Sequence, residues 1–300
     1  MYFVQFSPAR VKVYPDPRLF ESRVRRFVSI RETENNYILA LMPGLLQGTV
    51  NATPFTVEED QMLLAVGLFM RNNGGIVHSW APHDAIEAMV EHAVTSGWPV
   101  SQFYGPAHTT YFAGRAYAQR TKQRFELSRT ERVYQLTHNT YKLPEDGHLR
   151  VAIEADIPLA ERWLRGFIAE ADYENDGRTL EQMVNEMISQ RVLYFWNAPR
   201  AVSMAAWVCP TPAGATINYV YTPPELRGRG YAKAVTAALG AQMLASGLKY
   251  CSIRTDVDDA QTNAMYQAIG AQSLCEFVRC IIHPVAQTEN PAKKLPLVML

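Results

Sequence analysis

The stretch Tyr219-Val-Tyr-Thr-Pro-Pro-Glu-Leu-Arg-Gly-Arg-Gly-Tyr-Ala232 decides the fold of this chain. It joins a strand-like run, Thr216–Tyr221, to a helix predicted over about Arg227–Ser246. Glycines let the backbone approach a ligand closely and turn several N–H groups toward one point. Because a helix N-terminus concentrates about half a positive charge, we predict a pyrophosphate site here. Its predicted residues are Arg227, Gly228, Arg229, Gly230, Tyr231 and Ala232.

Taken alone, this loop is equally consistent with a tight turn that carries solvated arginines. It is neither of two common phosphate motifs, because it lacks Gly-Lys-[Ser/Thr] and the third glycine of Gly-x-Gly-x-x-Gly. A second motif follows one strand later, where Asn263 and Tyr266 are one helical turn apart on the same side. Gly270 is well placed to end that helix. The second motif favours the ligand-binding interpretation.

Together the two motifs resemble the GNAT superfamily of acetyl-CoA-dependent N-acetyltransferases. The family signature [Gln/Arg]-x-x-Gly-x-[Gly/Ala] at the start of its third helix is matched by Arg227, Gly230 and Ala232. Its later segment Asn-x-x-Tyr-x-x-x-Gly is matched by Asn263, Tyr266 and Gly270. The resemblance extends over about Leu149–Ile282 in element order and spacing.

The resemblance implies direct transfer of an acyl group from a thioester to an amine, with acetyl-CoA as co-substrate. In that family the fourth strand bulges and splays from the fifth. Main-chain groups near Val220 and Tyr221 would then hold the acyl carbonyl and the pantetheine amide, and the loop 227–232 the pyrophosphate. Tyr266 matches the general acid, whose alternative role is packing the helix against the sheet. Asn263 is a predicted CoA contact, with a helix-surface amide as the alternative.

The general base and the acceptor are less well specified. Family members often carry a glutamate on the fourth strand, but Thr216–Tyr219 offers no carboxylate. Ordered water and Asp256 remain the two options. An acidic stretch between the first two helices of this half would attract a cationic amine or simply form a solvated loop. Its carboxylates belong to Glu170, Asp172, Glu174 and Asp176.

The two halves of the chain predict nearly the same order of elements, which indicates a tandem duplication. We therefore expect a mixed α/β architecture of two GNAT-like domains with the acyl-CoA N-acyltransferase fold. The predicted boundaries are 1–140 for a degenerate first copy, 149–285 for the acetyltransferase domain and 286–300 for a tail. The corresponding turn of the first copy, Ser79–Asp84, has no glycine and therefore cannot cradle a pyrophosphate in the same way.

Composition limits the partners. With 29 Lys+Arg and 29 Asp+Glu the net charge is zero, which argues against a general nucleic-acid binder. No apolar run reaches the roughly 18 residues of a membrane span, and the first residues lack a signal-peptide layout, so we expect a cytoplasmic protein without a membrane partner. The four cysteines show no Cys-x-x-Cys pairing, so we expect reduced thiols and no metal.

The function favoured by the sequence is an N-acetyltransferase acting on the amine of a small molecule. A peptide N-terminus or an aminoacyl acceptor is the alternative within the same chemistry. A non-catalytic CoA-binding sensor or scaffold is the alternative from another class, because the strand-four carboxylate is missing. The sequence leaves a homodimer open.

Overall fold

The computed structural model describes residues 8–171 and 178–284. These residues form two compact units. The first unit comprises residues up to Arg132 together with those from Cys275 onward, and the second unit runs from Val133 to Leu274. The predicted tail 286–300 lies outside the described residues.

The first unit is a sheet with helices packed against it. Its core consists of sheet residues such as Phe55 and Phe103 and of helix residues such as Met89 and Tyr117. Within the unit the strand order is β1-β2-β3-β4-β5, followed by the later part of β12 (Gln272–His283) and the first part of β6 (Arg124–Leu136). The elements in chain order are β1 (Arg10–Val13), α1 (Pro17–Ile30), α2 (Asn36–Gln47), β2 (Ala52–Glu59), β3 (Met62–Met70), β4 (Gly75–His78), α3 (His83–Thr95), β5 (Gln102–Pro106), α4 (Ala107–Thr121) and most of β6 (Arg124–Leu136).

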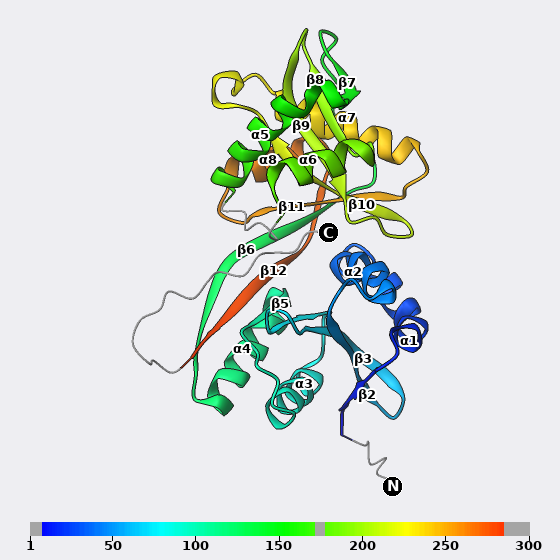
Figure 1. Ribbon diagram of the computed structural model, residues 1–300, viewed down its shortest axis with the longest axis vertical. Helices are drawn as coiled ribbons and strands as arrows, with labels where there is room; N and C mark the ends of the chain where they lie inside the picture. The colour runs from blue at the N-terminus through cyan, green and yellow to red at the C-terminus, as the bar shows by residue number, and fades with distance from the viewer. Residues whose placement is uncertain (1–7, 172–177, 285–300) are drawn as a thin grey trace. The chain divides into compact units, whose positions relative to one another are not determined.

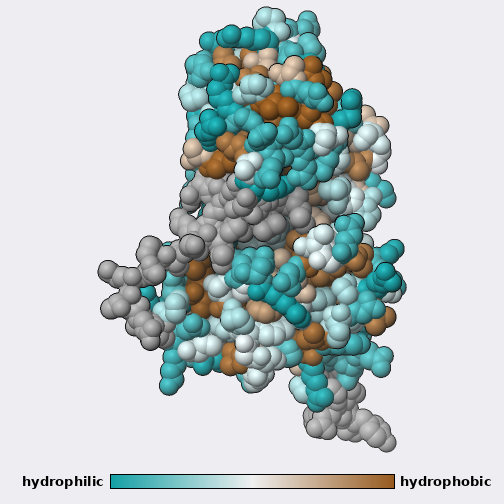
Figure 2. All heavy atoms as spheres, viewed as in Figure 1, coloured by the Kyte–Doolittle hydropathy of each residue, from teal (hydrophilic) through white to brown (hydrophobic). Residues whose placement is uncertain are grey.

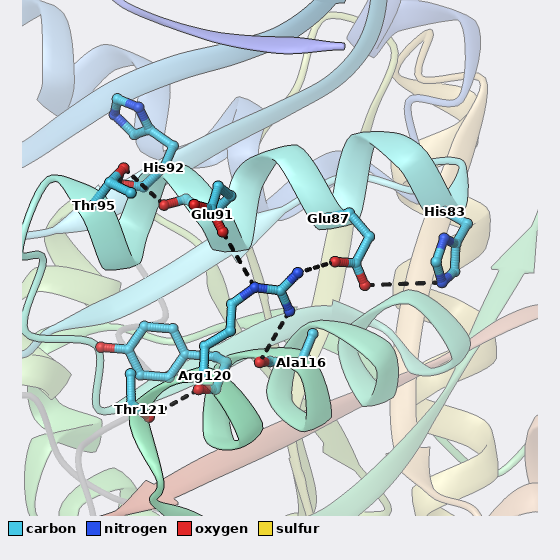
Figure 3. A network of polar contacts seen from close by, with 9 residues as sticks. His83, Glu87, Glu91, His92, Thr95, Ala116, Arg120 and Thr121 are labelled. Atoms are coloured by element: carbon cyan, nitrogen blue, oxygen red, sulfur yellow. Dashed lines mark hydrogen bonds and ion pairs between the residues drawn. The ribbon is translucent and has the colours of Figure 1, made fainter. Parts of the chain in front are cut away.

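Helices α3 and α4 of the first unit are joined by a polar network on their exposed side (Figure 3). The guanidinium of Arg120 on α4 pairs with Glu87 and, at 3.3 Å, with Glu91, both on α3. His83 lies 4.0 Å from the other oxygen of Glu87. Exposed pairs of this kind contribute little each, at most about 1 kcal/mol, so the helices are held mainly by the core beneath them.

The second unit repeats the same order of elements around its own part of one 12-stranded sheet. One face of this sheet packs against α5 and α6 through residues such as Trp163 and Met183, and the other against α7 and α8 through residues such as Val235 and Tyr266. The strand order is β6-β11-β10-β9-β8-β7. The elements are β7 (His148–Val151), α5 (Ile157–Glu170), α6 (Leu180–Ser189), β8 (Leu193–Asn197), β9 (Ala201–Val208), β10 (Gly214–Tyr221), α7 (Tyr231–Ala245), β11 (Tyr250–Asp256), α8 (Ala260–Ala268) and the start of β12 (Gln272–His283).

The two units exchange the ends of their last strands. β6 begins in the first unit, but from Val133 it belongs to the second; β12 begins in the second, but from Cys275 it belongs to the first. Figure 1 shows these two strands as long ribbons side by side. The compact units therefore differ from the predicted boundaries at 140 and 149. The reason is that strand pairing is a long-range choice, and an alternating strand pattern does not say which sheet it joins.

The tandem order is confirmed, but several predictions in the first half were wrong. The apolar pattern of the sequence predicts a helix over Ser29–Leu41 that Pro43-Gly44 ends, whereas in the structure α1 continues to Ile30 and α2 includes Pro43. The apolar residues of α2 are buried on both sides of the proline, which offsets the lost backbone hydrogen bond. Strands β1 and β2 were not predicted.

Among the described residues visible in Figure 2, hydrophobic residues form patches that are separated by hydrophilic ones. In the described part of the chain, no helix is long and apolar enough to cross a membrane. Of the four cysteines, Cys209, Cys251 and Cys280 are buried and Cys275 is partly buried. Among the described residues no group of three or more His, Cys, Asp or Glu side chains is placed to hold a metal ion.

Candidate functional site

The site begins with a bulge in β10. Tyr219 adopts a left-handed conformation with φ 52°, and the register between β10 and β9 shifts between Asn218 and Tyr221. A bulge of this kind adds one residue and turns the following side chains to the opposite face of the sheet. Accordingly, Ile217 belongs to the core under α7, whereas Tyr219 and Tyr221 both belong to the core under α5.

The bulge coincides with the end of the parallel ladder between β10 and β11. The register of this ladder runs from Gly214–Tyr250 to Ile217–Ile253 and covers only the first half of β10. The carboxyl half, which contains Val220 and Tyr221, lies beyond it. Ser203 of β9 fixes this end, because its hydroxyl donates to the Tyr221 carbonyl at 3.0 Å. Of the two predicted main-chain contacts, the Tyr221 carbonyl is therefore already used within the protein.

The glycine loop follows directly at the start of α7. The helix begins at Tyr231, four residues later than predicted, and Gly230 caps it in the left-handed region with φ 80°. The first helical hydrogen bond runs from the Ala234 N–H to the Gly230 carbonyl at 2.9 Å, so the preceding amides of this turn have no acceptor within the helix. A side chain at Gly228 would meet no atom within 4 Å. The predicted loop therefore offers amides beside open space.

Arg227 does not point its charge into this loop. Its Nη2 lies 2.6 Å and 2.7 Å from the two carboxylate oxygens of Glu170, at the end of α5, and its Nε donates to the Thr222 carbonyl at 2.8 Å. The Glu170 carboxylate therefore competes for the guanidinium, and the contact of the Arg227 side chain with a pyrophosphate stays a prediction. Arg229 is exposed, and the Lys233 ammonium lies over the ring of Tyr141 at 5.4 Å.

Asn263 is a structural residue rather than a surface amide. It is 6% exposed, and its Nδ2 donates to the carbonyls of Asp256 and Asp259, each at 2.7 Å. Its Oδ1 accepts from the Tyr134 hydroxyl at 2.8 Å. The predicted CoA contact of this side chain is therefore not supported, because its hydrogen-bonding groups serve the protein interior.

Tyr266 lies one helical turn further along α8 and is 5% exposed. Burial raises the pKa of its phenol above the ordinary value of 10.0, and the nearby Asp259 charge adds to the rise. The phenol therefore stays neutral and keeps its proton at neutral pH. Within the described residues, Trp196 Nε1 and Asn197 Oδ1 are the only fully buried side-chain nitrogen or oxygen atoms without a hydrogen bond. The phenol oxygen of Tyr266 is therefore not a buried polar atom that lacks a partner.

The carboxylates proposed as base or acceptor site lie at different places. Asp256 uses Oδ1 to accept from the Asp258 N–H at 2.9 Å and so stabilises the turn after β11. On β10, Thr216 is buried and its hydroxyl bonds Ser252 of β11 at 2.7 Å. Glu170 ends α5, whereas Asp172, Glu174 and Asp176 lie outside the described residues.

The sequence did not predict a role for Ser203 or Tyr134, since neither residue belongs to a local motif.

Comparisons with known proteins agree with this geometry. Residues 195–280 match the family model of FR47-like proteins. A GCN5-related N-acetyltransferase from Sphaerobacter thermophilus is similar in structure, with a TM-score of 0.60, 16% identity, and 95% of this chain and 98% of that one covered. The chain is a tandem GNAT-fold protein. No curated protein matches its sequence.

Two further structures extend over nearly the whole GNAT-fold chain. A GNAT-family acetyltransferase from Colwellia psychrerythraea covers 92% of this chain and 100% of its own, with a TM-score of 0.53 and 14% identity. A tandem GNAT protein from the clavulanic acid biosynthesis pathway covers 93% and 99%, with a TM-score of 0.55 and 10% identity. At these identities the likeness shows the fold.

Proposed function

We propose that the second unit transfers an acetyl group from acetyl-CoA directly to the amine of a small molecule. The observation that carries the proposal is the bulge at Tyr219, immediately followed by a left-handed glycine at the N-terminus of α7. Together they place main-chain groups at the carboxyl end of β10 and free helix amides within one short segment. An acyl carbonyl and a pyrophosphate require such donors at the two ends of one ligand.

The residues present fit acetyl-CoA. Gly228, Arg229 and Gly230, with the first amides of α7, would hold the pyrophosphate in the open space beside the loop. The main chain at Val220 would hold the acyl end, because it lies beyond the β10–β11 ladder. When bound, acetyl-CoA supplies an activated thioester. The protein's share of the catalysis is then mainly orientation of the amine and of this carbonyl.

Tyr266 is proposed to donate a hydrogen bond to the departing sulfur. Its raised pKa keeps the phenol protonated, which a donor requires. A thiol has an ordinary pKa of about 8.5, so full transfer of the proton from this phenol to a thiolate is uphill. The phenol therefore acts through a hydrogen bond that strengthens as negative charge develops on sulfur.

The acceptor is proposed to be a cationic amine. Glu170, half-exposed at the end of α5, presents a carboxylate that already binds the guanidinium of Arg227. A carboxylate that holds one cation can hold another, provided that Arg227 turns toward a bound phosphate. The amine must lose a proton before attack, and ordered water is the proposed route since Asp256 is engaged in its turn.

The test measures acetyl-CoA consumption across a panel of small amines, peptides and aminoacyl compounds, for the wild type and Tyr266→Phe. We expect turnover on a small amine and a loss of roughly 10- to 100-fold in Tyr266→Phe, because one hydrogen bond to developing charge is removed. Tyr117→Phe, at a buried tyrosine of the first unit, is the matched control and should leave turnover unchanged. Wild-type turnover that is equal in Tyr266→Phe refutes the donor role.

Thermal stabilisation separates the remaining alternatives. A melting temperature that rises with neither acetyl-CoA nor CoA would contradict both the enzyme and the CoA-binding sensor. Stabilisation by both, without turnover on any amine of the panel, favours the sensor. Turnover on a peptide or an aminoacyl compound alone moves the acceptor to that class.

A further inference from the structure

Tyr134 is the residue through which the end of β6 reaches the candidate catalytic helix. It lies in the last residues of β6, within the second unit, and is fully buried at 0% exposure. Its hydroxyl donates to Asn263 Oδ1 at 2.8 Å, and its ring packs against the ring of Tyr266 with centroids 5.9 Å apart. One side chain therefore contacts both Asn263 and Tyr266 of α8.

Asn263 passes this contact on to the backbone. Its Nδ2 donates to carbonyls of the turn between β11 and α8, those of Asp256 and Asp259 at 2.7 Å each and that of Val257 at 3.4 Å. The first turn of α8 is thus tied to the end of β11 by an amide that Tyr134 holds in place. Loss of the Tyr134 hydroxyl leaves Asn263 Oδ1 buried without its side-chain partner, which favours rearrangement of the amide.

The chain that follows β6 holds the other end of the same helix. The Thr140 N–H donates to the Ile269 carbonyl at 3.1 Å. Gly270 ends the helix with φ 97°, and a side chain there would come within 2.9 Å of the His138 carbonyl. Residues 134–140 therefore fix both ends of α8, and Tyr266 lies between these two points.

We infer that Tyr134 is a positioning residue for the reaction proposed for the second unit. It acts through Asn263 and the ring of Tyr266, not on reacting atoms, and it holds the Tyr266 ring in place. The inference rests on the proposed function. It also gives the first half of the chain a role in catalysis, because that half provides the strand on which Tyr134 lies.

The test is a double-mutant cycle with Tyr134→Phe and Tyr266→Phe in the full chain, with kcat and KM measured for each variant. We expect Tyr134→Phe to lower kcat by roughly 10-fold or more through misplacement of the phenol. The KM for acetyl-CoA should change less than about twofold, because the glycine loop is not touched. In the Tyr266→Phe background, Tyr134→Phe should cause no further loss of kcat, since two residues that act through one group are not additive.

Tyr117→Phe is the matched control for losing a buried hydroxyl, because the Tyr117 hydroxyl bonds the Trp98 carbonyl at 3.1 Å within the first unit. It should leave kcat unchanged. If Tyr134→Phe does not fold at the assay temperature, Thr140→Pro removes the donor to Ile269 at an exposed residue and should show the same non-additivity with Tyr266→Phe.

The outcomes separate the inference from the proposed function. An unchanged kcat in Tyr134→Phe, or an equal loss in both backgrounds, overturns the positioning role while wild-type turnover maintains the proposed function. A wild type that turns over no amine overturns the proposed function, and the positioning role with it. A loss of kcat confined to the background that retains Tyr266 supports both.

Discussion

A fragment of residues 149–285 is expected not to fold, although it spans the whole stretch that the sequence assigns to one GNAT-like domain. It lacks the end of β6, where Val133, Tyr134 and Leu136 are each 0% exposed. Burial of one such side chain contributes about 1.5–3 kcal/mol, so the three contribute roughly 5–9 kcal/mol. A domain is stable by only about 5–15 kcal/mol in total. The missing strand therefore removes a free energy comparable to the whole stability of the unit.

The assay compares fragments 149–285 and 133–285 by circular dichroism melting and size-exclusion chromatography. The shorter fragment should aggregate or lack a cooperative transition, because β11 is left with an open edge. The longer one restores the strand and should melt cooperatively. β12 cannot easily fold back to fill the gap, since Gln272–His283 contains no Gly, Pro, Asn or Asp to form a turn. Cooperative melting of 149–285, with stabilisation by acetyl-CoA, would refute the strand exchange.

Two further predictions concern single residues. Gly230→Glu should weaken acetyl-CoA binding by about 100-fold or more in thermal-shift titrations, because a carboxylate beside the α7 amides repels phosphate. The control is Gly97→Glu, at a left-handed glycine with open space in the first unit, which should bind acetyl-CoA normally. Equal affinity of the two variants would show that the loop was misassigned. Burial lowers the pKa of His78 from 6.5 to about 4, so only the unfolded state gains this proton between those pH values. Stability should fall as the pH drops through that window, by up to about 3 kcal/mol. Melting of His78→Gln should depend less steeply on pH, and equal slopes would contradict this assignment.

The elements of the fold were predictable where local pattern alone determines them. The helix Ala107–Thr121 and the strand Ala201–Val208 have the predicted bounds, because their apolar periodicities are unbroken between clear end signals. Pro43 was misleading, since burial of α2 outweighs a local helix-breaking preference. The exchange of β6 and β12 was not predictable, because either strand could pair within its own half without any change in its sequence pattern.

In the candidate site, too, features set by local sequence were predictable, whereas contacts between residues distant in sequence were not. The glycine loop was found because a left-handed backbone at a helix start is a local property that glycine reveals in sequence. The bulge at Tyr219 was expected only through the family resemblance. The intramolecular partners of Arg227 and Asn263 were not predictable, since Glu170 and Tyr134 are distant in sequence and no spacing rule connects them.

The first unit has different residues at the positions that correspond to the candidate site of the second unit. In the first unit the glycine that caps α7 is replaced by Pro82 before α3, and the ring and carbonyl of His78 lie against Gly105 at the end of the parallel strands. Counted from the start of the helix, Ala113 of α4 takes the place of Tyr266 in α8. The first copy therefore differs from the second in the glycine loop, in the end of the parallel strands and in the tyrosine of the last helix. It still contains β6, the strand whose end belongs to the second unit. The second unit uses that strand in its core, where Tyr134 is buried, bonds Asn263 and packs against Tyr266 of α8.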